Sequence, residues 1–124
     1  MTEEEVLAMK AGRELNTRVA EDVMGCIVAY DAFLGDMQRW IDSQGDSVWG
    51  PLERYSEDHS VAEKVVGRLE SKYNARIEFN YATENWEAEF SELATGLGLG
   101  TASALDRPEA ICKAALLAVL PKRA

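Results

Sequence analysis

The chain has 124 residues and a formal net charge of −9, because 22 acidic residues outnumber 13 basic ones. This length suits one domain and is too short for two full-sized ones, so we expect a single domain over residues 1–124. An acidic chain lacks the basic face that displaces counterions from duplex nucleic acid, and an anionic membrane surface repels it. We therefore expect neither of these partners.

Three further features concern the compartment. The longest apolar run, Ala114–Leu120, is far shorter than the roughly 20 residues of a membrane span. The acidic N-terminus is not followed by the apolar core of a signal peptide. Cys26 and Cys112 lie in or beside apolar sequence and are expected to be reduced, buried thiols. Together they predict a cytoplasmic protein.

Two helices are expected at the N-terminus. Thr2 and Glu5 have the spacing of a capping box, which predicts a short helix from Glu3 to about Met9. A second helix is expected over Arg13–Met24, with Gly25 as its C-terminal stop. The apolar positions of this second helix fall on one stripe, formed by Leu15, Val19 and Val23.

The stretch Cys26–Leu52 permits two interpretations. Ile27–Tyr30 suits either a strand or a continuation of the helix, and the polar turn Ser43–Ser47 between apolar flanks is typical of a hairpin. The competing interpretation is a helix over Asp31–Ile41.

A third helix and a second hairpin follow. Ser56 is the expected N-cap of the helix, and Asn74 suits a left-handed exit from it. Strict alternation of apolar and polar residues over 76–81 and 86–90 then predicts a hairpin with one buried face. The buried stripe of the helix is Val61, Val65 and Leu69, and the apolar strand positions are Ile77, Phe79, Tyr81, Trp86, Ala88 and Phe90.

The C-terminal part is expected to be a loop followed by a helix. Residues 92–105 are rich in Gly, Ala and Thr and predict a loop, after which Asp106 and Glu109 have capping-box spacing. Ile111–Leu120 is apolar almost all round apart from Lys113, which indicates a helix buried in the core or between subunits. The order of elements predicts an α+β fold with helices packed on a small antiparallel sheet.

Motifs for catalysis are weak in this sequence. His59 lies beside Asp58 and Ser60, but neighbouring positions of a helix point to different sides, so we expect a surface histidine. One histidine and two distant cysteines do not make a zinc site. The glycines of 96–100 match neither the dinucleotide fingerprint nor the P-loop, which leaves a connector or a mobile lid whose hydroxyl donors would be Thr101 and Ser103.

Charged and aromatic residues supply the remaining candidates. Glu78, Glu87 and Glu89 are expected on a solvated sheet face that repels phosphate. A nucleotide site needs at least an aromatic ring that stacks on the base and an arginine that binds the phosphate. For each aromatic residue, however, packing in the core or contact between subunits is the more common role. The candidate rings are Trp40, Trp49, Tyr55, Tyr81 and Trp86, and the arginines are Arg13, Arg18, Arg39, Arg54, Arg76 and Arg107.

Three blocks of the sequence resemble a known family. They are residues 2–15 with 19–25, residues 55–58 with 62–66, and residues 110–117, and they stand in the order and spacing of the phage ABA sandwich domain family. These are small proteins encoded by phages and prophages. The chain departs from the family at Cys26, where the family usually has Trp, and at Lys113, where it often has Arg.

The resemblance implies an α-β-α sandwich with no catalytic motif. We expect neither a cofactor nor a metal. The family is similar to phage sponges of the Thoeris anti-defence type, which oligomerise and sequester cyclic nucleotide signals such as cyclic ADP-ribose isomers without cleaving them. Lys113 and Arg13 are the matched positions with positive charge. With the candidates above, the expected ligand-binding residues are Arg13, Arg107, Lys113, Trp49, Trp86, Thr101 and Ser103.

The hypothesis that follows is a non-enzymatic, oligomeric phage protein that sequesters a nucleotide-derived immune signal in the cytoplasm of the infected bacterial host. The alternative is a phage protein that acts by protein–protein contact, such as an acidic inhibitor of a host factor. An enzyme is the least favoured hypothesis.

Overall fold

A computed structural model describes residues 2–120 of the chain. Four α-helices, one π-helical turn and six strands are formed by these residues, which confirms the predicted α+β class. The helical elements are α1 (Glu3–Ala8), α2 (Arg13–Arg18), the π-helical turn η1 (Val19–Val23), α3 (His59–Leu69) and α4 (Arg107–Val119). The strands are β1 (Ile27–Asp31), β2 (Gly35–Ile41), β3 (Ser47–Pro51), β4 (Tyr73–Asn80), β5 (Asn85–Glu92) and β6 (Gly98–Ala104).

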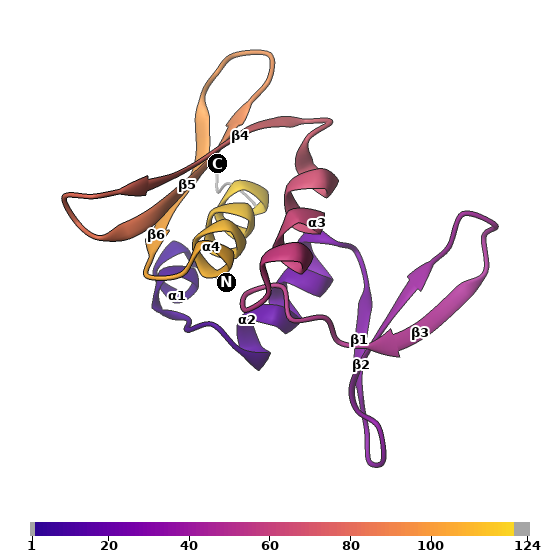
Figure 1. Cartoon of the computed structure of the whole chain (residues 1–124). Helices are drawn as coiled ribbons and strands as arrows, with labels where there is room; N and C mark the ends of the chain where they lie inside the picture. The colour runs from indigo at the N-terminus through magenta and orange to yellow at the C-terminus, as the bar shows by residue number, and fades with distance from the viewer. Residues whose placement is uncertain (1, 121–124) are drawn as a thin grey trace.

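The strands form two antiparallel sheets where the sequence predicted one. Sheet A has the order β1-β2-β3 and sheet B the order β4-β5-β6. Helix α4 lies between sheet B on one side and α2, η1 and α3 on the other (Figure 1). Sheet A projects from the side of this body, next to the end of η1 (Figure 1). The helices therefore cover one face of sheet B, and its polar face stays open.

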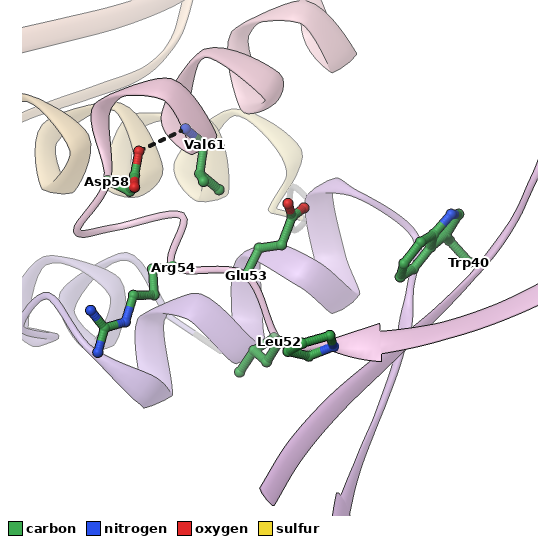
Figure 2. A pocket seen from close by; sticks show the side chains of 7 residues that line it. Trp40, Leu52, Glu53, Arg54, Asp58 and Val61 are labelled. Carbon is green, nitrogen blue, oxygen red and sulfur yellow. Dashed lines mark hydrogen bonds between the residues drawn. The ribbon is translucent and has the colours of Figure 1, made fainter. Parts of the chain in front are cut away.

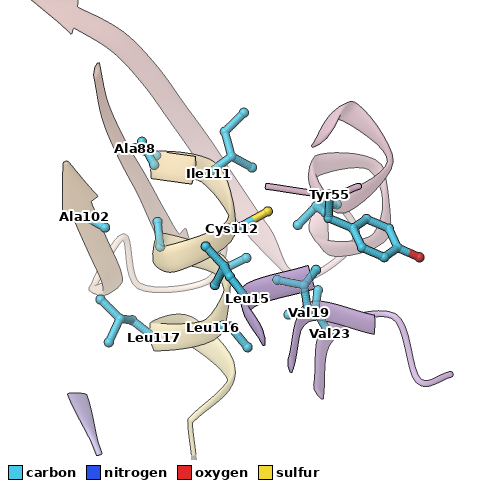
Figure 3. Close-up of a cluster of buried hydrophobic side chains, with 14 of the residues drawn as sticks. Leu15, Val19, Val23, Tyr55, Ala88, Ala102, Ile111, Cys112, Leu116 and Leu117 are labelled. Atoms are coloured by element: carbon cyan, nitrogen blue, oxygen red, sulfur yellow. The ribbon is translucent and has the colours of Figure 1, made fainter. Parts of the chain in front are cut away.

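Helix α4 is the centre of the core, as its apolar sequence predicts. Every residue from Pro108 to Ala118 except Glu109 is buried. Its small side chains face Ala88 and Ala102 of sheet B, while Leu15, Val19 and Tyr55 pack on its other side (Figure 3). Alanine and glycine at this contact let the helix and the sheet approach closely.

The helix caps are confirmed at α1 and differ at α3 and α4. The Glu5 N–H donates to Thr2 Oγ1 at 3.2 Å, as the capping box requires. At α3 the N-cap is Asp58, whose carboxylate accepts from the Ser60 and Val61 N–H groups. The expected N-cap, Ser56, is instead buried and donates through its hydroxyl to Asn16 Oδ1 at 2.6 Å. The prediction for Ser56 was wrong because this long-range partner outcompetes the local cap.

The predicted box at the start of α4 is also not formed. Asp106 occupies the N-cap position, but its side chain makes no capping hydrogen bond. Glu109 turns away and accepts from the Ala11 N–H at 3.1 Å and from Lys113 Nζ at 3.1 Å. The carboxylate that local spacing assigns to a cap thus ties the N-terminal segment to α4.

The open question over Cys26–Leu52 is decided in favour of strands. β2 pairs with β1 and β3, so the competing helix over Asp31–Ile41 was wrong, and the turn between β2 and β3 is confirmed. Two predictions near sheet B were wrong as well. Asn74 lies within β4, so it does not form a left-handed exit from α3. The expected loop 92–105 contains β6, which pairs with β5 and packs on α4 despite its weak strand formers.

Candidate functional site: a cleft beside Trp40

One candidate site is a cleft between sheet A and α3, which we call the Trp40 cleft. It consists of two adjoining hollows of about 400 Å³ and about 370 Å³ that share Trp40 and Glu53. Figure 2 shows Trp40 on β2 and Asp58 and Val61 at the start of α3, with Glu53 between them. The other residues of the cleft are Met24, Cys26, Gln38, Ile41, Pro51, Leu52, Arg54, Tyr55, Lys64 and Arg68.

Strand alternation and one glycine position the Trp40 ring. Gln38 and Trp40 point to the same face of β2, and Gln38 is 3% exposed, so this is the inner face of sheet A. Trp40 leans across to β3, where a Cβ at Gly50 would lie 2.9 Å from the Trp40 ring carbon Cη2. Gly50 therefore leaves the space that the indole occupies.

Replacing Gly50 with alanine should displace the Trp40 ring and alter the cleft. The added methyl group meets a ring that moves more easily than backbone, so we expect less than about 1.5 kcal/mol of destabilisation. The intrinsic fluorescence maximum of the protein should shift as the indole changes its exposure. Gly35→Ala is unsuitable as a control because Gly35 has φ +82°, whereas Gly67→Ala adds a methyl group in open space. An unchanged spectrum for Gly50→Ala would contradict this role for Gly50.

The floor of the cleft is a hydrogen-bonded set around Gln38. Its Oε1 accepts from the Tyr55 hydroxyl at 3.1 Å and from the Glu53 N–H at 3.2 Å. Burial raises the pKa of Tyr55, so its hydroxyl stays protonated and keeps donating. This fixed floor is preorganised, which reduces the entropy lost when a ligand binds.

The π-helical turn supplies the apolar wall. The Met24 N–H donates to the Val19 carbonyl and the Cys26 N–H to the Ala20 carbonyl, so the wide turn ends α2 and delivers Met24 and Cys26 to the cleft. Burial, and then the Glu53 carboxylate, raise the pKa of the Cys26 thiol against the opposing effect of Arg68. A protonated thiol is a weak nucleophile, so Cys26 acts here as an apolar surface.

The charges of the cleft are locally positive although the chain is acidic. Lys64 Nζ lies 2.5 Å from Glu53 Oε1, so these two charges compensate. The Asp58 carboxylate is held by the cap of α3, and hydrogen bonds from Ser60 and Val61 lower its pKa. Arg54 and Arg68 form no ion pair with the described residues. Arg54 lines one hollow and Arg68 lines the other, so each hollow has one guanidinium group that is available to an anion.

The seven residues predicted as ligand-binding lie in separate parts of the molecule. Arg13 and Trp49 are near sheet A but face different groups. Arg13 Nε forms an ion pair with Asp36 Oδ2 at 2.8 Å and its guanidinium carbon lies 6.0 Å from the centre of the Tyr30 ring. Trp49 lies on the outer face of the sheet, where the Arg39 guanidinium is 5.7 Å from its centre.

Two other predicted residues do come together. The Arg107 guanidinium carbon lies 5.9 Å from the centre of the Trp86 ring, and Arg107 Nη1 is 2.5 Å from Glu63 Oε1. Glu63 already compensates the charge of Arg107. Through Glu63 and Trp86, Arg107 links α4 to α3 and to sheet B. Thr101 and Ser103 lie on the opposite, polar face of sheet B, where Thr101 donates to Glu89 at 3.3 Å. No single site contains all four of these residues.

Lys113 is buried inside the molecule. Its side chain is 8% exposed, and its ammonium donates to the Leu7 carbonyl at 3.2 Å and to Glu109 Oε2 at 3.1 Å. Of the glycines of 96–100, Gly100 is placed by packing, since a Cβ there would lie 2.1 Å from the Ala114 carbonyl oxygen. The backbone of this segment therefore approaches α4 closely.

Several residues of the Trp40 cleft were not among the predicted site residues. Trp40, Tyr55 and Arg54 were candidates by residue type, whereas Lys64 and Arg68, which are exposed on α3, were not. Only the tertiary structure shows that these two cations line a hollow together with residues of sheet A. The expected surface position of His59 is confirmed, and neither Cys26 nor Cys112 forms a disulfide. Residues 2–120 contain no group of His, Cys, Asp and Glu arranged to hold a metal ion.

Comparison with known proteins identifies the family and the fold of this chain. The family model of the phage ABA sandwich domain matches residues 17–116. The chain belongs to this family. A crystal structure of a phage protein from Bacillus cereus ATCC 14579 has a similar fold, with a TM-score of 0.65 and 24% sequence identity, over 90% of this chain and 94% of that one. No curated protein matches the chain.

Membership of the phage ABA sandwich family confirms the resemblance found in the sequence. The matched range includes η1, sheet A, α3 and most of α4, so the Trp40 cleft lies within the family domain. Among the described residues, no helix is long and apolar enough to cross a membrane.

Proposed function

We propose that this phage ABA sandwich protein binds and sequesters a nucleotide-derived immune signal in the Trp40 cleft, without catalysing a reaction. The observation that carries this proposal is that Trp40 lines both hollows, one with Arg54 and one with Arg68, and that neither arginine has a carboxylate partner among the described residues. An aromatic face stacks on a base, and guanidinium groups bind phosphate. The two hollows lie at the lower end of the size range for small-ligand sites.

Sequestration rather than turnover is supported by the chemistry of the lining. The cleft contains one thiol with a raised pKa, one phenol with a raised pKa and no histidine. Glu53 is the carboxylate that lines both hollows, and it is paired with Lys64. These groups bind and orient a ligand, whereas general acid–base catalysis needs a group that titrates near neutral pH. The proposed place of action is the cytoplasm of the infected bacterial host.

Replacing Trp40 with alanine should weaken ligand binding by about tenfold to a hundredfold, because stacking of one base contributes about 1–3 kcal/mol. Calorimetry against ADP-ribose isomers and cyclic oligonucleotides measures the affinity. Arg68→Gln should weaken binding of the same ligand by a similar factor, since a hydrogen bond to a charged group contributes about 1.5–3 kcal/mol. Mass spectrometry should recover the ligand unchanged after incubation.

The matched controls are Trp49→Ala and Arg39→Gln. Trp49 is 49% exposed and Trp40 is 38% exposed, and both lie on sheet A, but Trp49 and Arg39 face away from the cleft. Both controls should bind as the wild type does. Equal losses for Trp40→Ala and Trp49→Ala would contradict this location, and absence of binding to the whole panel would contradict the function.

The alternative function, contact with a host protein, is supported by the open face of sheet B. This face carries Glu78, Glu87 and Glu89 with Arg76, which pairs with Glu78 and Glu89. A net charge of −9 attracts a basic partner over a distance. Such a complex would weaken steeply with salt and would be abolished by Glu87→Lys, while Trp40→Ala would leave it intact.

A further inference from the structure

The outer face of sheet A is apolar and uncovered. Alternation places Val28, Gln38 and Gly50 on the inner face, where Gln38 and Gly50 are buried. The residues between them therefore point outward. On this outer face lie Ile27, Ala29 and Asp31 of β1, Gly35, Met37, Arg39 and Ile41 of β2, and Ser47, Trp49 and Pro51 of β3.

Several large apolar side chains of this face and of its hairpin are exposed. Ile27 is 50% exposed, Ile41 62% and Trp49 49%, and the hairpin between β1 and β2 adds Phe33 at 97%. A hollow of about 250 Å³ is lined by Ala29, Asp31, Met37 and Trp49 of this face together with Tyr30 and Leu34. Contiguous apolar surface of this kind indicates a contact with another molecule.

The pattern of charge on the face favours a second copy of the chain. Arg39 and Asp31 are its two charged residues, and they lie one row to either side of Met37 in the strand register. A two-fold axis across the strands at Met37 brings the Arg39 row of one copy opposite the Asp31 row of the other. The face thus carries complementary charges for itself, although the whole chain has a net charge of −9.

The same axis also matches shapes. The β1–β2 hairpin with Phe33 and Leu34 projects beyond the Asp31 row, and the axis brings it over the Trp49 and Ile41 end of the partner. The exposed apolar tip of each copy then covers the exposed apolar end of the other. Binding of a different protein would not require the face to be complementary to itself in charge and shape.

We propose that the outer face of sheet A binds the outer face of a second copy, with a two-fold axis at Met37. Strands of five to seven residues give a face of about 15 Å by 20 Å, which is smaller than a permanent dimer interface. The dimer is therefore weak and depends on concentration. The Trp40 cleft lies mainly on the inner face of the sheet and shares only Ile41 and Pro51 with the outer face, so this proposal does not rest on the ligand.

Sedimentation equilibrium of the full chain from about 1 µM to about 500 µM tests the proposal. The wild type should rise from the monomer mass of 13.7 kDa toward twice that value. Met37→Glu and Met37→Lys should each weaken self-association at least tenfold, because the axis places two like charges together. An equal mixture of the two variants should restore association as a heterodimer, which also demonstrates that both variants are folded.

The control is Tyr81→Glu, at a residue 86% exposed beside sheet B, which should associate as the wild type does. A wild type that remains monomeric at every concentration overturns the proposal and leaves the face to a foreign partner. Self-association that survives both Met37 variants, or a mixture that fails to recover it, overturns the two-fold arrangement at Met37. None of these results changes the calorimetric test of the Trp40 cleft.

Discussion

Alanine at position 100 should destabilise the protein by about 3 kcal/mol, the upper end of the cost of overpacking a core. The added Cβ would lie 2.1 Å from the Ala114 carbonyl oxygen and 2.5 Å from the Ala118 nitrogen. Both contacts are with the backbone of α4, so no side chain can rotate away. Either β6 or α4 must move, and α4 is buried along nearly its whole length. Calorimetry should show a fall in Tm of roughly 10 °C.

The control for this substitution is Gly67→Ala. Gly67 is exposed on α3 and a Cβ there meets nothing within 4 Å. In a helix interior, alanine is favoured over glycine by about 0.5–1 kcal/mol, so this variant should be slightly more stable than the wild type. Opposite signs for the two glycine substitutions are the expected result. A Gly100→Ala protein as stable as the wild type would show that β6 and α4 are not in close contact.

Replacing Lys113 with alanine should cost about 3 kcal/mol of stability, since removing one member of a buried ion pair leaves an uncompensated charge. The side chains of Lys113 and Glu109 are 8% and 20% exposed, and Nζ also satisfies the Leu7 carbonyl. The loss should loosen α1 from α4. Urea unfolding measures the free energy, and hydrogen exchange should locate increased opening in residues 3–12.

A double variant separates the charge from the packing. Lys113→Met keeps most of the aliphatic chain but leaves the Glu109 carboxylate buried without its partner, so it should remain strongly destabilised. Adding Glu109→Gln removes that stranded charge and should recover part of the loss, while the amide oxygen still accepts from the Ala11 N–H. If Lys113 instead serves the ligand, its substitution would lower affinity and leave stability unchanged.

The elements that the sequence predicted well carry a strong periodic signal. The stripe of Val65 and Leu69 in α3 and the alternation of β4 and β5 determine which face is buried, and the apolar sequence of α4 predicts burial on all sides. Strand β6 was missed because its Gly and Ala residues have low strand propensity, and Gly100, Ala102 and Ala104 are the positions that pack closely in the core. Sheet A stayed ambiguous because both its faces are partly exposed, which blurs the period-two pattern.

The candidate site was less predictable than the fold. Lys64 and Arg68 lie on the exposed side of α3. The local sequence does not reveal that residues of sheet A lie nearby and form a hollow with them. Lys113 was interpreted as an available cation, whereas one of its partners is Leu7, 106 residues away in the chain. Such partners are set by tertiary structure, which spacing along one helix does not reveal.

The alternation along β2 constrains how this family can vary in length. Met37 and Arg39 belong to the outer face, and Gln38 and Trp40 to the inner one, so four successive positions serve two different surfaces. Inserting or deleting one residue within β2 would exchange the two sets and disrupt both surfaces in a single event. Length changes among related phage proteins should therefore concentrate in the turns at 32–34 and 42–46, where they leave the strand register untouched.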